Sequence, residues 1–85
     1  MKTVTTDMDL MQWVADAERG DRCEYYRGHL AQARFDRQKQ VIAVANTALD
    51  LERERLVFLV QAREGEEFSY LAIARKKPSI FAGDI

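Results

Sequence analysis

The chain has 85 residues, 47% hydrophobic and 32% charged, which is enough apolar material for one small folded domain but not for two. Thirteen basic and fourteen acidic residues give a net charge of −1, so any nucleic-acid role needs a local basic face rather than an overall positive charge. A single cysteine, Cys23, excludes an intramolecular disulfide, and there is no apolar N-terminal run; we therefore expect a cytoplasmic protein without a membrane segment.

The first helix is predicted close to the N-terminus. Residues before Thr6 are prone to β structure but have no evident partner strand. Thr6 and Asp9 have the Thr-x-x-acid spacing of a capping box, so we expect the helix to begin near residue 7. Arg19 and Gly20 suit a helix C-terminus and place its end near residue 18 or 19. Its core face is predicted from apolar residues at three- and four-residue spacing: Leu10, Trp13, Val14 and Ala17.

The middle of the chain predicts a short strand followed by two helices. Cys23 and Tyr25 alternate with polar neighbours, which indicates a half-buried strand ending near Gly28. A short helix is expected from Leu30, and a longer one from about residue 37 to residue 55, with Asp36 as its candidate cap. The longer helix has a wide apolar stripe made of Val41, Ile42, Ala45, Ala48 and Leu49, with Val44 and Leu51 at its edges.

Residues 56–77 predict a β-hairpin, because two runs rich in β-branched, aromatic and leucine residues flank a charged break at Gly65. Setting residue 63 opposite residue 68 pairs 61 with 70, 60 with 71 and 58 with 73. This register predicts a core face made of Phe58, Val60, Leu71 and Ile73. It places Leu59, Gln61, Arg63, Phe68 and Tyr70 on the opposite, partly polar face.

The order helix, strand, helix, helix, hairpin predicts an α+β fold of the winged-helix type, in which a hairpin packs beside the recognition helix of a helix-turn-helix. We expect one domain over residues 1–85, with a folded core at about 7–77 and a C-terminal tail at 78–85. Four segments resemble a pattern in small uncharacterised proteins of phages and prophages: Gly20-Asp21, the run from Tyr25 to Ala31, the run from Leu59 to Arg63, and the run from Tyr70 to Arg75. The resemblance implies a phage or prophage setting and no particular activity.

The helix over residues 37–55 would be the DNA-reading helix of such a fold. Amide and basic side chains can bond to base edges in the major groove, and arginines nearby can hold phosphates. The candidate contacts are Arg34, Arg37, Lys39, Gln40, Asn46, Thr47, Arg53 and Arg63. Against them stand acidic residues at the hairpin tip, Glu64, Glu66 and Glu67, which would repel a phosphate backbone. The first hypothesis is a DNA-binding or transcription-regulatory module, which could act as a homodimer.

The alternative is a protein-binding module or inhibitor that targets host nucleic-acid-handling machinery. The near-zero net charge and the acidic hairpin tip favour it, because negative charge can occupy a basic groove of a partner. The candidate contacts lie on the partly apolar hairpin face and in the tail: Leu59, Gln61, Phe68, Tyr70, Ile80 and Phe81. A third possibility stays open for residues 37–55, since a helix face of mixed charge is often simply solvated.

Catalysis is not expected. The sequence holds one histidine, one cysteine and no metal-binding or phosphate-loop motif, so we predict no enzyme activity, metal, cofactor or small-molecule substrate. His29 is expected in a structural or surface role. Cys23, Trp13 and Tyr25 are expected in the core, whereas Tyr26 and Tyr70 are candidates for exposed contacts.

Overall fold

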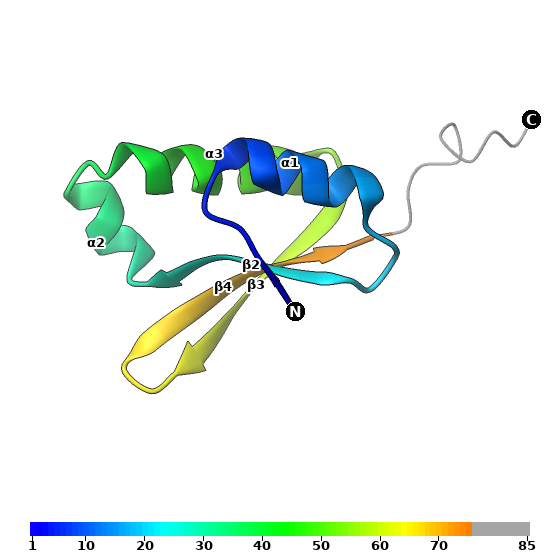
Figure 1. Cartoon of the computed structure of the whole chain (residues 1–85). Helices are drawn as coiled ribbons and strands as arrows, with labels where there is room; N and C mark the ends of the chain where they lie inside the picture. Colours follow the sequence, from blue (N-terminus) through cyan, green and yellow to red (C-terminus); the bar gives the residue numbers. More distant parts are fainter. Residues whose placement is uncertain (76–85) are drawn as a thin grey trace, which may run out of the picture.

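A four-stranded mixed β-sheet, with α1 and α3 lying over one of its faces, forms the computed structural model, which describes residues 1–75 (Figure 1). The α+β class is confirmed. The helices are α1 (Asp7–Asp16), α2 (Leu30–Phe35) and α3 (Lys39–Arg53), and the strands are β1 (Lys2–Thr3), β2 (Arg22–Gly28), β3 (Val57–Glu64) and β4 (Glu67–Ala74). Ile80 and Phe81, the predicted tail contacts, lie outside the described residues.

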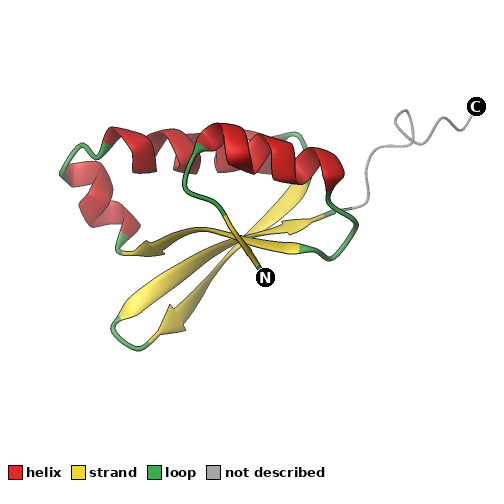
Figure 2. Ribbon diagram, in the orientation of Figure 1, coloured by secondary structure: helices red, strands yellow, loops and turns green. Residues whose placement is uncertain are grey.

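The strands are arranged in the order β1-β2-β4-β3, with β1 parallel to β2 and the other neighbours antiparallel (Figure 2). The opening residues therefore do have a partner strand, which two paired residues were too few to reveal by pattern. Lys2 pairs with Cys23, and the Val4 N–H donates to the Glu24 carbonyl at 3.0 Å. Because Val4 is buried in the core, the folded part of the chain begins at its first few residues.

Helix α1 begins where the capping box predicted, because the Thr6 hydroxyl accepts the Asp9 N–H at 3.0 Å. It ends earlier than expected. Ala17 is extended and buried, and the Glu18 N–H donates to the Asp21 carboxylate in a following turn. Burying Ala17 in the core is thus favoured over one further helical turn, and Gly20, at φ +94°, serves the turn into β2 rather than a helix cap.

A tight turn separates α2 from α3. Asp36 ends α2 and does not cap α3, whose N-cap is Gln38 with no side-chain hydrogen bond. Arg37 takes the left-handed conformation, at φ +56°, and the Gln38 N–H donates to the Ala33 carbonyl at 3.1 Å. The prediction that Asp36 caps α3 was wrong, because Asp36 is the C-cap residue of α2 and the turn to α3 follows it.

The buried stripe of α3 is rotated relative to the prediction. Val44, Ala45, Ala48 and Leu51 are buried, whereas Leu49 is exposed. The pattern contained two overlapping stripes, and the helix uses the one that faces both α1 and the sheet, since α3 packs against α1 on one side and against β2 and β3 on another.

The hairpin has the predicted register, with Arg63 opposite Phe68 and Phe58 opposite Ile73. The predicted faces were inverted on β3, where Val57 is buried and Leu59 packs against the core, whereas Phe58 and Val60 are 53% and 40% exposed. On β4 the predicted core residue Leu71 is buried and Ile73 is half-buried, while Ala72 is also buried and Tyr70 packs against the core from the opposite face. Both faces are apolar, so composition alone could not choose between them; Ala72 and Ala74 are small enough to let helices approach closely.

The core lies between the helices and this face of the sheet. Cys23 and Tyr25 are buried in it, as predicted, and Trp13 is half-buried and packs against it. Tyr26 and Tyr70 also pack against the core instead of lying freely exposed. The other buried members of the cluster are Val4, Leu10, Val14, Val44, Ala48, Leu51, Val57 and Ala72.

Candidate nucleic-acid interface

The corner where α2 meets α3 is a basic part of the described chain. Within residues 29–49, which span α2, the turn and most of α3, three residues are basic and one, Asp36, is acidic, although the whole chain is slightly acidic. Arg37 and Lys39 are exposed on the turn and on the first turn of α3, and Arg34 is half-buried beside them. This first turn contains no acidic residue, so the positive end of the α3 dipole adds to the local charge.

The corner is held in place by β4 and by the end of β2. The Leu30 N–H, at the start of α2, donates to the Tyr70 hydroxyl at 3.1 Å. Gly28, at φ +140°, makes the bend from β2 into the helix, and the His29 ring meets the Phe68 ring edge-on at 5.8 Å. These contacts with the sheet fix the orientation of α2 and stabilise it, because a helix of six residues is not stable by itself in water.

Several predicted base-reading residues of α3 already have partners within the protein. Asn46 accepts a hydrogen bond from Arg34 at 3.3 Å, and Gln40 donates to the Thr5 carbonyl at 3.0 Å. Arg53 bonds to Asp50 at 3.4 Å near the other end of the helix, and Thr47 is half-buried. The structure thus places Arg37 and Lys39 at the start of α3, joins Arg34 of α2 to Asn46 in the middle of α3, and leaves Arg53 apart from them at the other end.

The hairpin tip has a different character. The Arg63 guanidinium lies over the Phe68 ring at 5.8 Å and its Nε donates to the Gly65 carbonyl. Glu64 lies 3.6 Å from Arg27, so one of the three tip carboxylates has a cation beside it. Arg63 is the sole predicted nucleic-acid contact on the hairpin, and its surroundings remain acidic.

The predicted protein-contact residues are divided by the sheet's true orientation. Leu59 and Tyr70 pack against the core beneath the helices, Phe68 is half-buried, and Gln61 is exposed. Sequence reasoning missed the exposed large apolar side chains of the hairpin, which are Phe58 and Val60. Another exposed large apolar side chain, Phe35, lies on α2 and is 83% exposed. No periodicity signal distinguishes Phe58 from Leu59, because both lie in one continuous apolar run.

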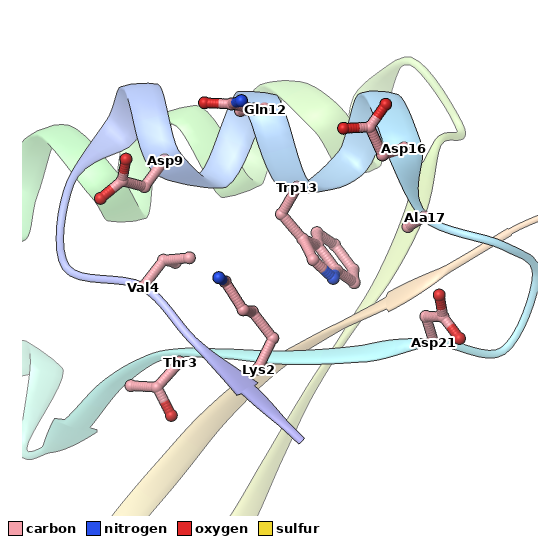
Figure 3. Close-up of a pocket in the computed structure, with 9 residues that line it drawn as sticks. All are labelled: Lys2, Thr3, Val4, Asp9, Gln12, Trp13, Asp16, Ala17 and Asp21. Carbon is pink, nitrogen blue, oxygen red and sulfur yellow. The ribbon is translucent and has the colours of Figure 1, made fainter.

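A hollow of about 470 Å³ opens between α1 and the β1–β2 edge of the sheet (Figure 3). The Trp13 ring and the Lys2 side chain extend into the space between helix and strand. Three carboxylates complete much of its polar lining: Asp9, Asp16 and Asp21. The lining provides charge and an aromatic surface, but it contains neither a histidine nor a cysteine to act as a nucleophile beside a base.

Two buried groups have shifted proton affinities. Burial raises the pKa of the Cys23 thiol to about 11, and burial together with the neighbouring Tyr70 raises the pKa of Tyr25 to about 12. Cys23 is therefore a protonated packing residue at neutral pH and not an activated thiolate. Within residues 1–75, no group of three or more histidine, cysteine, aspartate or glutamate side chains is placed to hold a metal ion.

No helix among the described residues is both long and apolar enough to cross a lipid bilayer. Comparison with protein-family models, with curated protein sequences and with solved structures finds no match to the chain.

Proposed function

We propose that the protein is a small, non-catalytic, cytoplasmic nucleic-acid-binding module of winged-helix type that regulates transcription in a phage or prophage setting. The observation that carries the proposal is the concentration of positive charge at the α2–α3 corner of a chain whose net charge is −1. Residues outside 29–49 contain ten basic and thirteen acidic side chains, so the corner is the part of the chain best suited to a polyanion.

The exposed cations of the corner would contact phosphates. Arg37 projects from the turn and Lys39 from the first turn of α3, where backbone N–H groups and the helix dipole also favour an anion. Arg34 is held by Asn46 and so presents its guanidinium with little loss of side-chain entropy. About three phosphate contacts fit this arrangement.

Base reading would contribute less than phosphate binding. Gln40 and Asn46, the amides that could bond adenine, are engaged within the protein, and Asp50 lies further along the same helix. We therefore expect modest sequence preference and strong salt dependence. The acidic hairpin tip restricts contact to the helical side of the corner.

The test is a fluorescence anisotropy titration of a labelled DNA duplex at several salt concentrations. Three phosphate contacts predict that the logarithm of the association constant falls with the logarithm of salt concentration with a slope of about −3. A duplex of unrelated sequence should bind with similar affinity. Absence of binding at low salt, or an affinity that does not change with salt, would contradict the proposal.

A second candidate function is recognition of a host protein through the hairpin. The exposure of Phe58 and Val60 on the sheet favours it, because exposed apolar side chains on one face suit a protein contact. Affinity capture from host lysate with the wild-type chain and with Phe58→Glu tests this candidate. A partner that both proteins retain equally does not bind through this face.

A further inference from the structure

The sheet has one face that none of the described helices covers (Figure 2). On this face the strand register places Phe58 beside Ile73 and Val60 beside Leu71. In a two-layer fold an uncovered face is usually polar, with apolar residues turned toward the helices. Here its centre is apolar, and Phe58 and Val60 are exposed, which suits the face to a further layer of polypeptide.

The charged group next to this centre is already paired. Glu24 is 8% exposed, and its carboxylate accepts hydrogen bonds from the Ser69 hydroxyl and from Arg27. A layer over Leu71 can therefore cover Glu24 as well without leaving its carboxylate unpaired.

A hollow of about 360 Å³ lies at one end of this face. Phe58 and Ile73 line it together with Arg75, whose guanidinium lies 4.2 Å over the Phe58 ring. Gly20 also lines the hollow, and a Cβ atom at this glycine would meet nothing within 4 Å. Because an apolar cavity of about 150 Å³ can hold a benzene ring, the hollow has room for an aromatic side chain.

The chain leaves the described structure beside this hollow. The Arg75 N–H donates to the Leu56 carbonyl at 3.0 Å, which extends the pairing of the hairpin by one residue beyond Ala74. The residues that follow in the sequence include Pro78, which has no N–H to give to a neighbouring strand and favours the second position of a tight turn. A turn at this position would direct the next residues back over the sheet.

The distance from Arg75 to the centre of the face is short enough for this segment to cover. Phe58 lies across from Ile73, which is two positions before Arg75 and so about 7 Å back along the strand. A layer packed on a sheet lies about 10 Å above it. Six residues of extended chain, which separate Arg75 from Phe81, reach about 20 Å, so enough length remains for the turn.

The sequence after Pro78 also has an apolar pattern that matches the face. Alternate residues of an extended chain share one side, so Phe81 and Ile85 would face the same way, with Gly83 between them. Phe58 and Val60 are spaced along β3 in the direction that a segment returning from the end of β4 would follow. Two large apolar side chains would therefore meet the apolar centre in the same order along the strand.

We propose that the uncovered face of the sheet is the docking site of residues 78–85 of the same chain. Phe81 enters the hollow beside Phe58, and Ile85 lies further along β3 toward Val60. The sheet is then covered on both faces, by helices on one and by this segment on the other.

The covalent connection favours this occupant over a separate chain. A segment joined to its site by a short link has an effective concentration in the millimolar range, whereas a second copy or another protein must bind from dilute solution. The link begins at Arg75, which itself borders the hollow. Contacts too weak to hold a separate molecule can therefore hold this segment on the face.

The first experiment attaches a nitroxide spin label to Ala82→Cys in the full chain and measures the broadening of backbone amide signals by NMR. Cys23 is fully buried, so the label attaches at residue 82 alone. We expect the amide signals of Phe58, Val60 and Leu71 to lose most of their intensity. The signals of α1, on the other side of the sheet, should keep theirs and serve as the internal control.

A mixed sample identifies what covers the face. It combines spin-labelled chain of natural isotope content with isotope-enriched chain that carries no spin label, so only contacts between copies can broaden a signal. No broadening is expected. Broadening of the Phe58 and Val60 signals in the mixed sample would assign the face to a second copy and overturn the proposal, as would unaffected signals in the labelled chain itself.

The second experiment measures the rate at which chymotrypsin cleaves after Phe81, with mass spectrometry to identify the product. Phe58→Glu should make this cleavage about tenfold faster, because a carboxylate in the hollow releases the segment and a protease acts on undocked chain. Phe35→Glu, the same substitution at an exposed phenylalanine of α2, should leave the rate unchanged.

Circular dichroism spectra establish that each variant is folded, and Val60→Glu provides a second substitution on the face if Phe58→Glu does not fold. Cleavage after Phe81 at the same rate in the wild type and in the folded face variant overturns the proposal. The docking does not depend on the proposed function, so a chain that shows it and fails to bind DNA overturns the proposed function alone.

Discussion

The hydroxyl of Tyr70 accepts the backbone N–H of Leu30 at 3.1 Å, which joins the middle of β4 to the first residue of α2. The residue before the helix, His29, makes no capping hydrogen bond with its side chain. The Tyr70 hydroxyl, which comes from a strand, therefore accepts a backbone N–H at the start of α2, as a serine or aspartate side chain at the N-cap does in other helices. The position of the basic corner therefore depends on the hairpin.

Removing this hydroxyl should destabilise the protein. We expect Tyr70→Phe to lower the free energy of unfolding by about 1 kcal/mol, because the Leu30 N–H loses its partner in a partly buried site. Urea denaturation measures the change. Tyr26→Phe is the matched control, since that hydroxyl makes no hydrogen bond to the described residues, and it should change stability by only a few tenths of a kcal/mol. Equal effects of the two substitutions would contradict the capping role.

Gly28 is the position in the bend before α2 where a side chain should be least tolerated. A Cβ atom there would lie 3.0 Å from the Tyr26 hydroxyl oxygen and 3.2 Å from its ring, with φ at +140°. Gly28→Ala should therefore cost about 2 kcal/mol or more of unfolding free energy. Gly65→Ala, at φ +65° with open space around it, should cost about 1 kcal/mol. Thermal or urea denaturation compares them, and an alanine at 28 tolerated as well as one at 65 would refute the clash.

Stability should fall at alkaline pH. Burial raises the pKa of Cys23 to about 11 from 9.0, so between these values the unfolded chain loses a proton that the folded chain keeps. Because the pKa of Cys23 is higher in the folded state, the contribution of the buried thiol to the free energy of unfolding is complete below pH 9. That contribution is lost as pH rises toward 11, at roughly 1.4 kcal/mol per pH unit. Tyr25, with its pKa raised to about 12, extends the decline above pH 10.

Urea denaturation at a series of pH values measures how the free energy of unfolding changes with pH. The slope of that change, rather than its absolute value, tests whether Cys23 and Tyr25 cause the decline. Cys23→Ala should flatten the decline between pH 9 and pH 10, while leaving the part above pH 10 that Tyr25 causes. An unchanged slope in the alanine variant would show that other groups are responsible.

The basic corner should account for the salt dependence of DNA binding. Replacing both Arg37 and Lys39 by alanine is expected to make the slope of the logarithm of the association constant less negative by about 2, because each cation contributes about one released counterion. Arg55→Gln removes one exposed charge at the opposite end of α3 and should leave the slope unchanged. The same fluorescence anisotropy titration measures all three proteins. A slope altered equally by Arg55→Gln would indicate general charge attraction without a defined site.

Local signals were sufficient to predict the three helices, the strand β2 and the hairpin with its register, but not the two-residue strand β1. The Thr6 capping box, the Gly65 turn and the alternation around Cys23 each depend on neighbours in sequence, and each was found where expected. The direction in which a strand faces depends instead on what packs against it. Phe58 and Leu59 are equally apolar, so the choice between them depends on which side of β3 the helix α3 packs against, which sequence periodicity does not encode.

The residues of the candidate site could be predicted from the sequence, but whether their side chains are free to bind a partner could not. The basic residues around α2 and α3 could be found from charge alone, and the structure brings Arg34, Arg37 and Lys39 to one corner. What sequence reasoning could not see was that Asn46 and Gln40 have partners within the chain, because those partners, Arg34 and Thr5, are distant in sequence. The winged-helix identity and the phage setting stay predictions.

The tyrosine cap also sets the order in which the molecule can be assembled during synthesis. A helix of six residues does not persist by itself in water, and its cap lies forty positions further along the chain. The α2–α3 corner can therefore take its final geometry only after β4 has left the ribosome and paired with β2. A nascent chain would thus not compete for nucleic acid while most of it is still being made, and the proposed binding surface would be among the last parts to form.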